Sequence, residues 1–253
     1  MNLLLAVTVG FLTAQVALFA TTVYLHRGIT HRGLTMRPAT ALPFRIFLWL
    51  ATGIRPREWA GVHRRHHAAL DTRDDPHSPA MVGLWKVQLL NIAMYHRAAH
   101  DRDEVARYTH DLADNRLDHW VFDHETIGPL LGLGFLCLVL GWPTGLVAGL
   151  VHLVVYVGLN GAINSWGHAA GTRPNENSAT NGRVLALLTA GEGLHNNHHA
   201  APTAARFSHR AGQIDPSWWF IRLLGCARLL TVRHEGGLLP APREHGRELA
   251  CVG

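Results

Sequence analysis

Two stretches of this chain carry no charged side chain, and the first has the pattern of a membrane-spanning helix. Residues 1–26 and 126–172 contain no Asp, Glu, Lys or Arg. Inside the first stretch, residues 3–25 form an apolar run of the roughly 20 residues that a helix needs to cross a bilayer. The pattern therefore predicts a transmembrane helix over residues 3–25.

The second uncharged stretch contains two apolar arms, residues 128–141 and 143–164. Trp142 and Pro143 lie between the arms, and this pair fits a tight turn at a membrane interface. The pattern predicts a transmembrane helical hairpin that brings the chain back to the side on which it entered.

A shorter apolar segment, residues 39–54, is expected to lie at the membrane surface. It contains Pro43 and Arg45 and is short for a span. If it crossed the bilayer, the histidine-rich segments before and after it would lie on opposite faces and could not share a site. As an interfacial or re-entrant helix, it leaves three spans, all charged segments on one face, and the amino terminus outside.

The remaining segments, residues 55–127 and 166–235, are polar and have the pattern of helices with short breaks. They are expected to form a helical cap on the cytoplasmic side, where short segments carry excess Lys and Arg. Residues 236–253, which contain glycines and prolines, are expected to be loosely ordered. The predicted fold is an all-α integral membrane protein with one domain over residues 1–253.

Composition agrees with a membrane protein and argues against a nucleic-acid partner. Only 16% of the 253 residues are charged, against about 25% in soluble domains. The 23 Lys and Arg residues are interleaved with 18 Asp and Glu residues, so the net charge of +5 is not expected to form a separate basic patch. The three cysteines have neither the spacing of a disulfide framework nor that of a metal site.

Histidine is the most informative residue type in the chain. Nine of the nineteen histidines fall in four short motifs: His26-Arg-Gly-Ile-Thr-His31, His63-Arg-Arg-His66-His67, Asn164-Ser-Trp-Gly-His168 and His195-Asn-Asn-His198-His199. Imidazole binds borderline transition metals such as iron and zinc. Nine imidazoles are too many for one mononuclear site, and they fit two metal ions with four or five ligands each. The motifs therefore predict a metalloenzyme.

The spacing within each motif predicts where the rings point. Positions i, i+3 and i+4 share one face of a helix, so each His-x-x-His-His motif is expected to aim three rings at one point. His26 and His31 lie about 140° apart on an ideal helix. We expect them to face different metals, or the helix to end between them at Gly28.

The other ten histidines have simpler interpretations. His152 lies inside a predicted span, where it either has a function or bonds a neighbouring helix. The rest are expected at solvated positions: His77, His96, His100, His110, His119, His124, His209, His234 and His245.

With these motifs, the chain resembles the membrane fatty acid desaturases of the stearoyl-CoA desaturase type, over roughly residues 20–230. The histidine motifs carry the resemblance, together with Glu58-Trp59-Ala60, Asp75-Pro76-His77, Asn164-Ser165 and Glu192-Gly193. Two features depart from the family pattern. One predicted span precedes the first motif where the family usually has two, so either the topology is reduced or the start is truncated. Val62 stands where relatives commonly have Asp, so a carboxylate that orients His63 is expected to be missing.

The resemblance implies a di-iron centre. Its implied ligands are His26, His31, His63, His66, His67, His168, His195, His198 and His199, with Asn164 contributing through a water. Further side chains could accept imidazole N–H bonds and orient the ligands: Glu58, Asp75, Glu192, Asn196 and Asn197. The arginines beside the motifs, Arg27, Arg32, Arg64 and Arg65, could pair with an anionic head group, a phosphopantetheine carrier or a lipid phosphate, or simply follow the positive-inside rule.

The implied function is an O2-dependent desaturase that introduces a cis double bond, most simply of the Δ9 type, into an acyl-CoA, an acyl-lipid or an acyl chain on acyl carrier protein. Removing hydrogens from an unactivated methylene requires an oxidant that a metal and dioxygen must supply. A tunnel from the cap into the spans would hold the acyl chain. The sequence has no haem, flavin or cysteine-cluster signature, so a separate ferredoxin, rubredoxin or cytochrome with its reductase is expected.

Two alternatives stay open. A hydroxylase on the same scaffold shares the first hydrogen abstraction and differs in its product. A non-enzymatic metal-binding or transport protein would carry labile zinc or copper, with ligands inside the spans. The predicted location is a bacterial-type cell membrane, with the active site on the cytoplasmic face.

Overall fold

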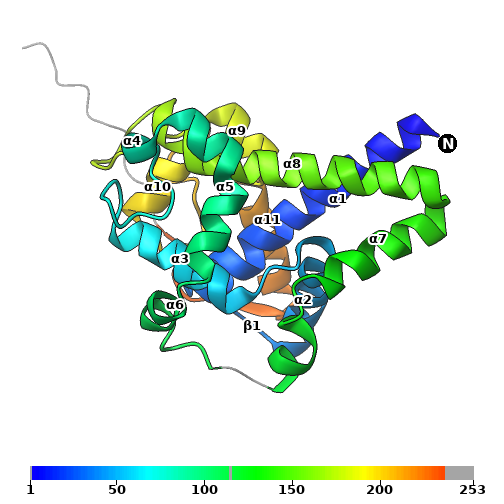
Figure 1. The fold of residues 1–253 in the computed structure, drawn as a ribbon. Helices are drawn as coiled ribbons and strands as arrows, with labels where there is room; N and C mark the ends of the chain where they lie inside the picture. Colours follow the sequence, from blue (N-terminus) through cyan, green and yellow to red (C-terminus); the bar gives the residue numbers. More distant parts are fainter. Residues whose placement is uncertain (1, 114–115, 237–253) are drawn as a thin grey trace, which may run out of the picture.

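Two long apolar helices pack against each other and extend through the molecule (Figure 1). A computed structural model of the chain describes residues 2–113 and 116–236. Helix α1 (Leu3–Ala20) continues directly into a π-helix, η1 (Thr21–Thr30), and the second long helix is α8 (Trp142–Ala169). Both are long and apolar enough to cross a membrane.

The two long helices run parallel and in close contact. The Thr21 hydroxyl lies 2.8 Å from the Tyr156 hydroxyl. At Gly10, an added Cβ would lie 2.4 Å from the carbonyl oxygen of Ala148 and 2.7 Å from Cβ of Val151. Glycine therefore permits the close approach, and the histidine-bearing ends of both helices lie at the same end of the molecule.

A helical hairpin leads into the second long helix, as the uncharged stretch predicts. Helix α7 (Ile127–Leu140) is shorter than α8, and Gly141 joins the two with a φ of +79°, a conformation that glycine adopts without strain. The second arm continues five residues beyond the expected end at residue 164. This extension places His168 on the last turn of α8.

Helix α2 (Pro38–Thr52) packs against α7, close to the interval expected for an interfacial helix. Gly128 and Gly132 permit this contact, because a Cβ on either would lie 2.3 Å from a carbonyl oxygen of α2. Arg45 on α2 pairs with Asp118 in η2 (Asp118–Phe122), and its guanidinium also lies 4.0 Å from the ring centre of Phe122.

The cap surrounds the end of α1 and α8 that lies away from the amino terminus (Figure 1). Its helices are α3 (Pro56–Ala68), α4 (Pro79–Val82), α5 (Leu84–Ala99), α6 (Arg102–Tyr108), α9 (Arg183–Leu188), α10 (His195–Ala200) and α11 (Pro216–Cys226). The expectation of helices with only short breaks over residues 166–235 is wrong in part, because residues 170–182 form a longer loop with isolated β-bridges at Thr172 and Asn181.

A small sheet also departs from the all-α prediction. Strands β1 (Leu34–Met36) and β2 (Leu230–Val232) pair antiparallel, with Thr35 opposite Thr231. Strands of three residues are too short for the alternation of four or more residues that predicts a strand.

The rest of the expected loose tail, residues 237–253, lies outside the described residues.

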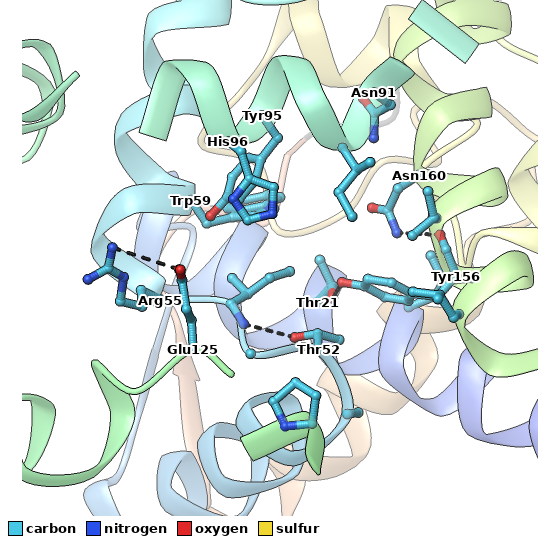
Figure 2. Close-up of a pocket in the computed structure, with 18 of the residues that line it drawn as sticks. Thr21, Thr52, Arg55, Trp59, Asn91, Tyr95, His96, Glu125, Tyr156 and Asn160 are labelled. Carbon is cyan, nitrogen blue, oxygen red and sulfur yellow. Dashed lines mark hydrogen bonds and ion pairs between the residues drawn. The ribbon is translucent and has the colours of Figure 1, made fainter. Parts of the chain in front are cut away.

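A cavity of about 480 Å³ lies where α3, α5, α7 and α8 meet (Figure 2). Tyr95 and His96 on α5, Trp59 on α3 and Tyr156 on α8 surround it. The cavity extends from the apolar hairpin toward the histidine-rich end of the cap.

Candidate metal centre

The nine motif histidines converge in two adjoining clusters. The first cluster contains His26, His31, His63, His67 and His198, and the second contains His66, His168, His195 and His199. Within each cluster, one nitrogen from every ring lies within 4.8 Å of the others. The clusters adjoin at His67 and His199, whose rings stack with centroids 4.2 Å apart.

A π-helix brings the two histidines of the first motif together. A π-helix bonds residue i to residue i+5, and the His31 amide donates to the His26 carbonyl at 3.0 Å. The two rings therefore lie close together, with centroids 4.9 Å apart, in one cluster. Both expectations for this pair are wrong, because the helix does not end at Gly28 and the ideal α-helical angle does not apply.

Each His-x-x-His-His motif divides its rings between the clusters, so the expectation of three rings at one point is also wrong. In α3, His63 and His67 face the first cluster and His66 faces the second. Residues i+3 and i+4 of a helix differ by about 100° in direction. His66 therefore points to one cluster, and His63 and His67 point to the other.

Helix α10 makes the same division in the opposite proportion. His198 faces the first cluster, whereas His195 and His199 face the second. His168 completes the second cluster from α8, with its Nε2 3.0 Å from Nε2 of His195.

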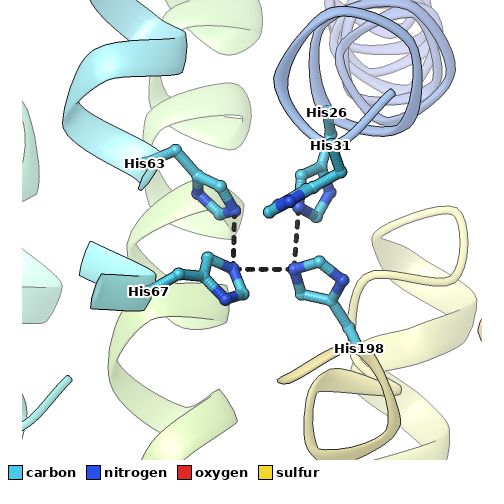
Figure 3. Close-up of side chains that lie close together, drawn as sticks. All are labelled: His26, His31, His63, His67 and His198. Carbon is cyan, nitrogen blue, oxygen red and sulfur yellow. Dashed lines mark hydrogen bonds between the residues drawn. The ribbon is translucent and has the colours of Figure 1, made fainter. Parts of the chain in front are cut away.

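The short contacts between ring nitrogens cannot all be hydrogen bonds. Nε2 of His198 lies 3.0 Å from Nε2 of His26 and 2.9 Å from Nε2 of His67, which in turn lies 3.0 Å from Nε2 of His63 (Figure 3). A ring nitrogen has either one in-plane hydrogen or one in-plane lone pair. A single atom therefore cannot satisfy two such neighbours, and the arrangement calls for a shared cation.

These spacings fit a transition metal. A metal ion holds imidazole nitrogens at about 2.1 Å, so two such ligands at right angles lie about 3 Å apart. Nε2 of His31 and Nε2 of His66 are buried and have no hydrogen-bond partner. Each belongs to a cluster, and a bound metal would satisfy both atoms.

In each cluster, one imidazole contacts a carboxylate. Glu192 Oε2 accepts from Nδ1 of His26 at 2.8 Å, and Asp75 Oδ1 accepts from Nδ1 of His66 at 2.9 Å. A ring whose Nδ1 donates presents the lone pair of Nε2 to the metal position. Burial raises the pKa of Asp75. Burial also opposes ionisation of Glu192, but His26 and Arg27 outweigh it and the pKa of Glu192 is lowered.

The other three candidates for this orienting role have different partners in the described residues, which corrects the expectation. Glu58 pairs with Arg55, its neighbour one turn earlier on the chain. Asn196 and Asn197 bond the loop before α9: Nδ2 of Asn196 donates to the Ala179 carbonyl at 3.0 Å, and Asn197 Oδ1 accepts from Asn181 at 2.8 Å. The i+1 and i+2 positions after His195 face this loop, so these amides anchor α10.

Burial favours the neutral form of the clustered rings on α3 and α10. It lowers the pKa of His67 to about 3, and it lowers the pKa values of His63, His66, His195 and His198 well below the usual value. Neutral imidazole is the form that binds a metal. Protons therefore compete weakly for these ligands at neutral pH.

Asn164 lies one turn before His168 on α8 and lines the cavity. Its Nδ2 donates to Asn91 Oδ1 on α5 at 2.9 Å. This bond fixes the amide near the second cluster, the cluster with four imidazoles.

Two further groups near the clusters were not found by sequence reasoning. Trp59 stacks on His63 with ring centroids 4.9 Å apart and nearly parallel planes. His77 is buried and stacks on His66 at 4.4 Å, so the expectation of a solvated position is wrong for it. Burial lowers its pKa to about 4. Both residues lie in the motifs that carry the family resemblance, which was the available signal.

Two other histidines are also buried. His209 is buried, against expectation, and its Nε2 lies 3.1 Å from the Arg206 carbonyl. His152 donates from Nε2 to the Ala51 carbonyl at 2.8 Å, which joins α8 to α2. That bond matches one of the two interpretations of His152.

The arginines beside the motifs bind parts of this chain. Arg64 donates to Asp111 Oδ1 at 2.6 Å and to the Thr30 carbonyl at 2.8 Å, and Arg32 pairs with the same aspartate. Arg27 is buried against Asp215 at 2.9 Å. An internal ion pair was not among the roles considered for these arginines.

The cavity reaches the first cluster from the apolar side. His26, His63 and Glu192 line one end, and Leu133 and Leu153 from the hairpin line the other. Between these ends, Tyr156 and Asn160 form a polar strip on α8 (Figure 2). A long apolar molecule could therefore extend from between the hairpin helices to the histidine clusters.

Several known proteins are similar to this chain in sequence. A family model described as "Fatty acid desaturase" matches residues 2–216. The chain is 32% identical over 231 residues to the "Delta-9 desaturase-like 2 protein" of Arabidopsis thaliana, covering 86% of this chain and 74% of that protein.

Two other relatives carry different substrate names. The chain is 32% identical over 213 residues to the "sn-1 stearoyl-lipid 9-desaturase" of Synechocystis sp., covering 82% of this chain and 65% of that protein. It is 31% identical over 224 residues to the "Acyl-CoA C20 Delta5-desaturase" of Anemone leveillei, covering 87% and 70%. The names differ in carrier and in double-bond position but agree on the class of reaction. With two clusters built from the histidine motifs and a family match over most of its length, the chain belongs to the fatty acid desaturase family.

Proposed function

We propose that this protein is an O2-dependent di-iron desaturase that introduces a cis double bond into a saturated fatty acyl chain. The observation that carries the proposal is the convergence of nine imidazoles in two adjoining clusters, and two of these imidazoles, His26 and His63, line the cavity. The Δ9 position and an acyl-CoA or acyl-lipid substrate are the most economical choice, because relatives with both kinds of carrier are named desaturases.

The metal ligands in this proposal are the nine clustered histidines, with Asn164 acting through a water on the second metal. Bound iron, with O2 and two electrons from a donor, would supply the oxidant that removes two hydrogens from neighbouring methylenes and leaves water. The chain's own side chains hold the reactants. Glu192 and Asp75 orient one imidazole each. The cavity wall of Leu133 and Leu153 binds the alkyl chain, at roughly 0.8 kcal/mol per buried CH₂.

The proposed location is a cell membrane of the bacterial type, with the clusters on the cytoplasmic side. Support comes from the parallel α1 and α8, whose histidine-bearing ends meet the cap, and from the connecting hairpin. A separate ferredoxin, rubredoxin or cytochrome with its reductase would deliver electrons.

Expression in a host that lacks desaturases, followed by mapping of double bonds in its lipids and thioesters, tests the proposal. We expect products two hydrogens lighter than their precursors. A gain of one oxygen would instead identify the hydroxylase alternative. Labile zinc or copper with unchanged lipids would identify a metal-binding protein.

The matched control is His198→Ala, which removes the ring that contacts both His26 and His67. We expect this variant to insert into membranes as the parent does and to form no new double bond. Full activity of the variant would contradict the ligand assignment.

A further inference from the structure

Arg27 is the largest fully buried side chain among the described residues, with 1% of its surface exposed. Its guanidinium donates to both oxygens of Asp215, at 2.9 and 3.0 Å, and to the Ala205 carbonyl at 2.7 Å. Asp215 also accepts from the Phe207 amide at 2.7 Å and the Trp218 amide at 3.2 Å. Each oxygen of Asp215 therefore accepts two hydrogen bonds, and the ion pair joins η1 to the start of α11.

The remaining donor of Arg27 begins a chain of hydrogen bonds that ends at the first cluster. Nε of Arg27 donates to Oγ1 of Thr22 at 3.2 Å, and Thr22 also bonds Oε1 of Glu192. Oε2 of Glu192 in turn lies 2.8 Å from Nδ1 of His26. Thr22, Arg27, Glu192 and His26 are all buried.

The direction of each bond in this chain is determined by its first member. Arginine can only donate, so the Thr22 oxygen accepts from Arg27 and its single hydrogen is available for Glu192. Glu192 then acts as an acceptor on that side. With Nδ1 of His26 donating to the other oxygen, the unprotonated nitrogen of His26 is Nε2, the atom that faces His198.

The loop that carries Glu192 is seated directly on the ion pair. A Cβ at Gly191 would lie 2.4 Å from Asp215 Oδ1 and 2.9 Å from Nη2 of Arg27, and the φ of this residue is +108°. Phe207 lies under the guanidinium at 3.8 Å and against the ring of His198 at 4.7 Å. The ion pair thus contacts the surroundings of the first cluster from two directions.

We propose that Thr22 and Arg27 are positioning residues of the first cluster: through Glu192 they fix the tautomer of His26, so that its Nε2 lone pair faces the metal. The inference rests on the proposed function, because it requires that this cluster binds iron. Thr22 and the buried Arg27–Asp215 pair would not bind the metal themselves. They would hold His26 in the tautomer that binds it. The second cluster has no part in this relay.

The test uses Thr22→Val, which keeps the shape of the side chain and removes the hydrogen that Glu192 accepts. Purified full-length protein in detergent is stripped of metal and titrated anaerobically with ferrous iron against a competing chelator. We expect the wild type to bind two irons per chain. In the variant, one site should lose affinity by roughly 10- to 100-fold, as is typical when a partner of a metal ligand is removed, while the other site is unchanged.

Two matched variants accompany it. Thr22→Ser keeps the hydroxyl and should restore the wild-type affinity. Thr30→Val removes a buried hydroxyl of the same π-helix that has no hydrogen-bond partner, and it should leave both affinities unchanged. Thr22→Ala repeats the measurement if valine prevents folding, as judged by thermal unfolding.

Unchanged affinities in Thr22→Val would overturn the relay while leaving a two-metal protein. Equal weakening of both sites, or equal weakening by Thr30→Val, would also overturn it, because the effect would then be general. Well-folded wild-type protein that binds no iron would contradict the proposed function itself, and the inference with it.

Discussion

The two histidine clusters draw on the same two helices, yet they are built differently. Helix α3 gives two rings to the first cluster and one to the second, and α10 does the reverse. The first cluster then gains His26 from the π-helix and His31 from the residue after it, whereas the second gains only His168 from α8. The first cluster therefore has five imidazoles, and the second has four with the amide of Asn164 one turn away.

This difference implies that two metal ions bound as proposed would not be equivalent. Five imidazoles leave little room for a further ligand at the first position. At the second, Asn164 is held by Asn91 beside the cavity, where a water or another small ligand could complete the coordination. The asymmetry can be tested by disturbing one cluster at a time.

The largest expected effect comes from two neighbouring residues that face different clusters. His67→Ala and His66→Ala should each abolish desaturation, because the proposed reaction requires both irons. Iron titration should nevertheless separate them: His67→Ala weakens the first site and His66→Ala the second. Loss of the same site in both variants would contradict the assignment of these rings.

The two carboxylates offer the next contrast. Glu192→Gln and Asp75→Asn each replace the acceptor that orients one ring, His26 in the first cluster and His66 in the second. Each should reduce the iron affinity of its own site by roughly 10- to 100-fold. Competition with a chelator measures this, and an effect on the opposite site would show that the carboxylates act through the fold in general.

Asn164→Leu should separate binding from activity. The nine imidazoles remain, so we expect two irons per chain, whereas desaturation should fall by about 10-fold as a partner of the second metal is lost. Product yield per iron-loaded chain is the measurement. Unaltered yield would remove Asn164 from the site.

The smallest expected effect is at Trp59, whose ring stacks on His63. Such a contact is worth about 0.5–1.5 kcal/mol, so Trp59→Leu should weaken the first iron site by roughly 2- to 10-fold. Chelator competition again gives the value. Stronger weakening of the second site would contradict the proposed orientation of His63 by stacking.

Much of the fold could be predicted from the sequence, because apolar runs and turn residues are local signals. The apolar run over residues 3–25 predicted the first long helix. The break at Trp142 and Pro143 predicted the hairpin of α7 and α8. Strands β1 and β2 could not be predicted, because three-residue strands show no alternation and their pairing joins distant parts of the chain. The extension of α8 to Ala169 crosses polar residues that apolar periodicity does not include.

For the candidate site, the sequence predicted which histidines come together but not how they divide between the two clusters. Their grouping follows from motif spacing and from the resemblance. The division of the histidines between the two clusters depends on the π-helix, which brings His31 close to His26. It also depends on which side of α3 faces each cluster. The roles of Thr22 and Asp215 depend on contacts between residues up to 188 positions apart, and single-sequence patterns contain no such information.

The central claim is that two irons occupy the two histidine clusters. Anomalous diffraction at the iron absorption edge, from crystals of iron-loaded protein with demonstrated desaturase activity, tests it most directly. The account predicts two peaks, one among the five rings around His198 and one among the four rings around His195. A fully active preparation with a single peak, or with iron outside the clusters, would contradict it.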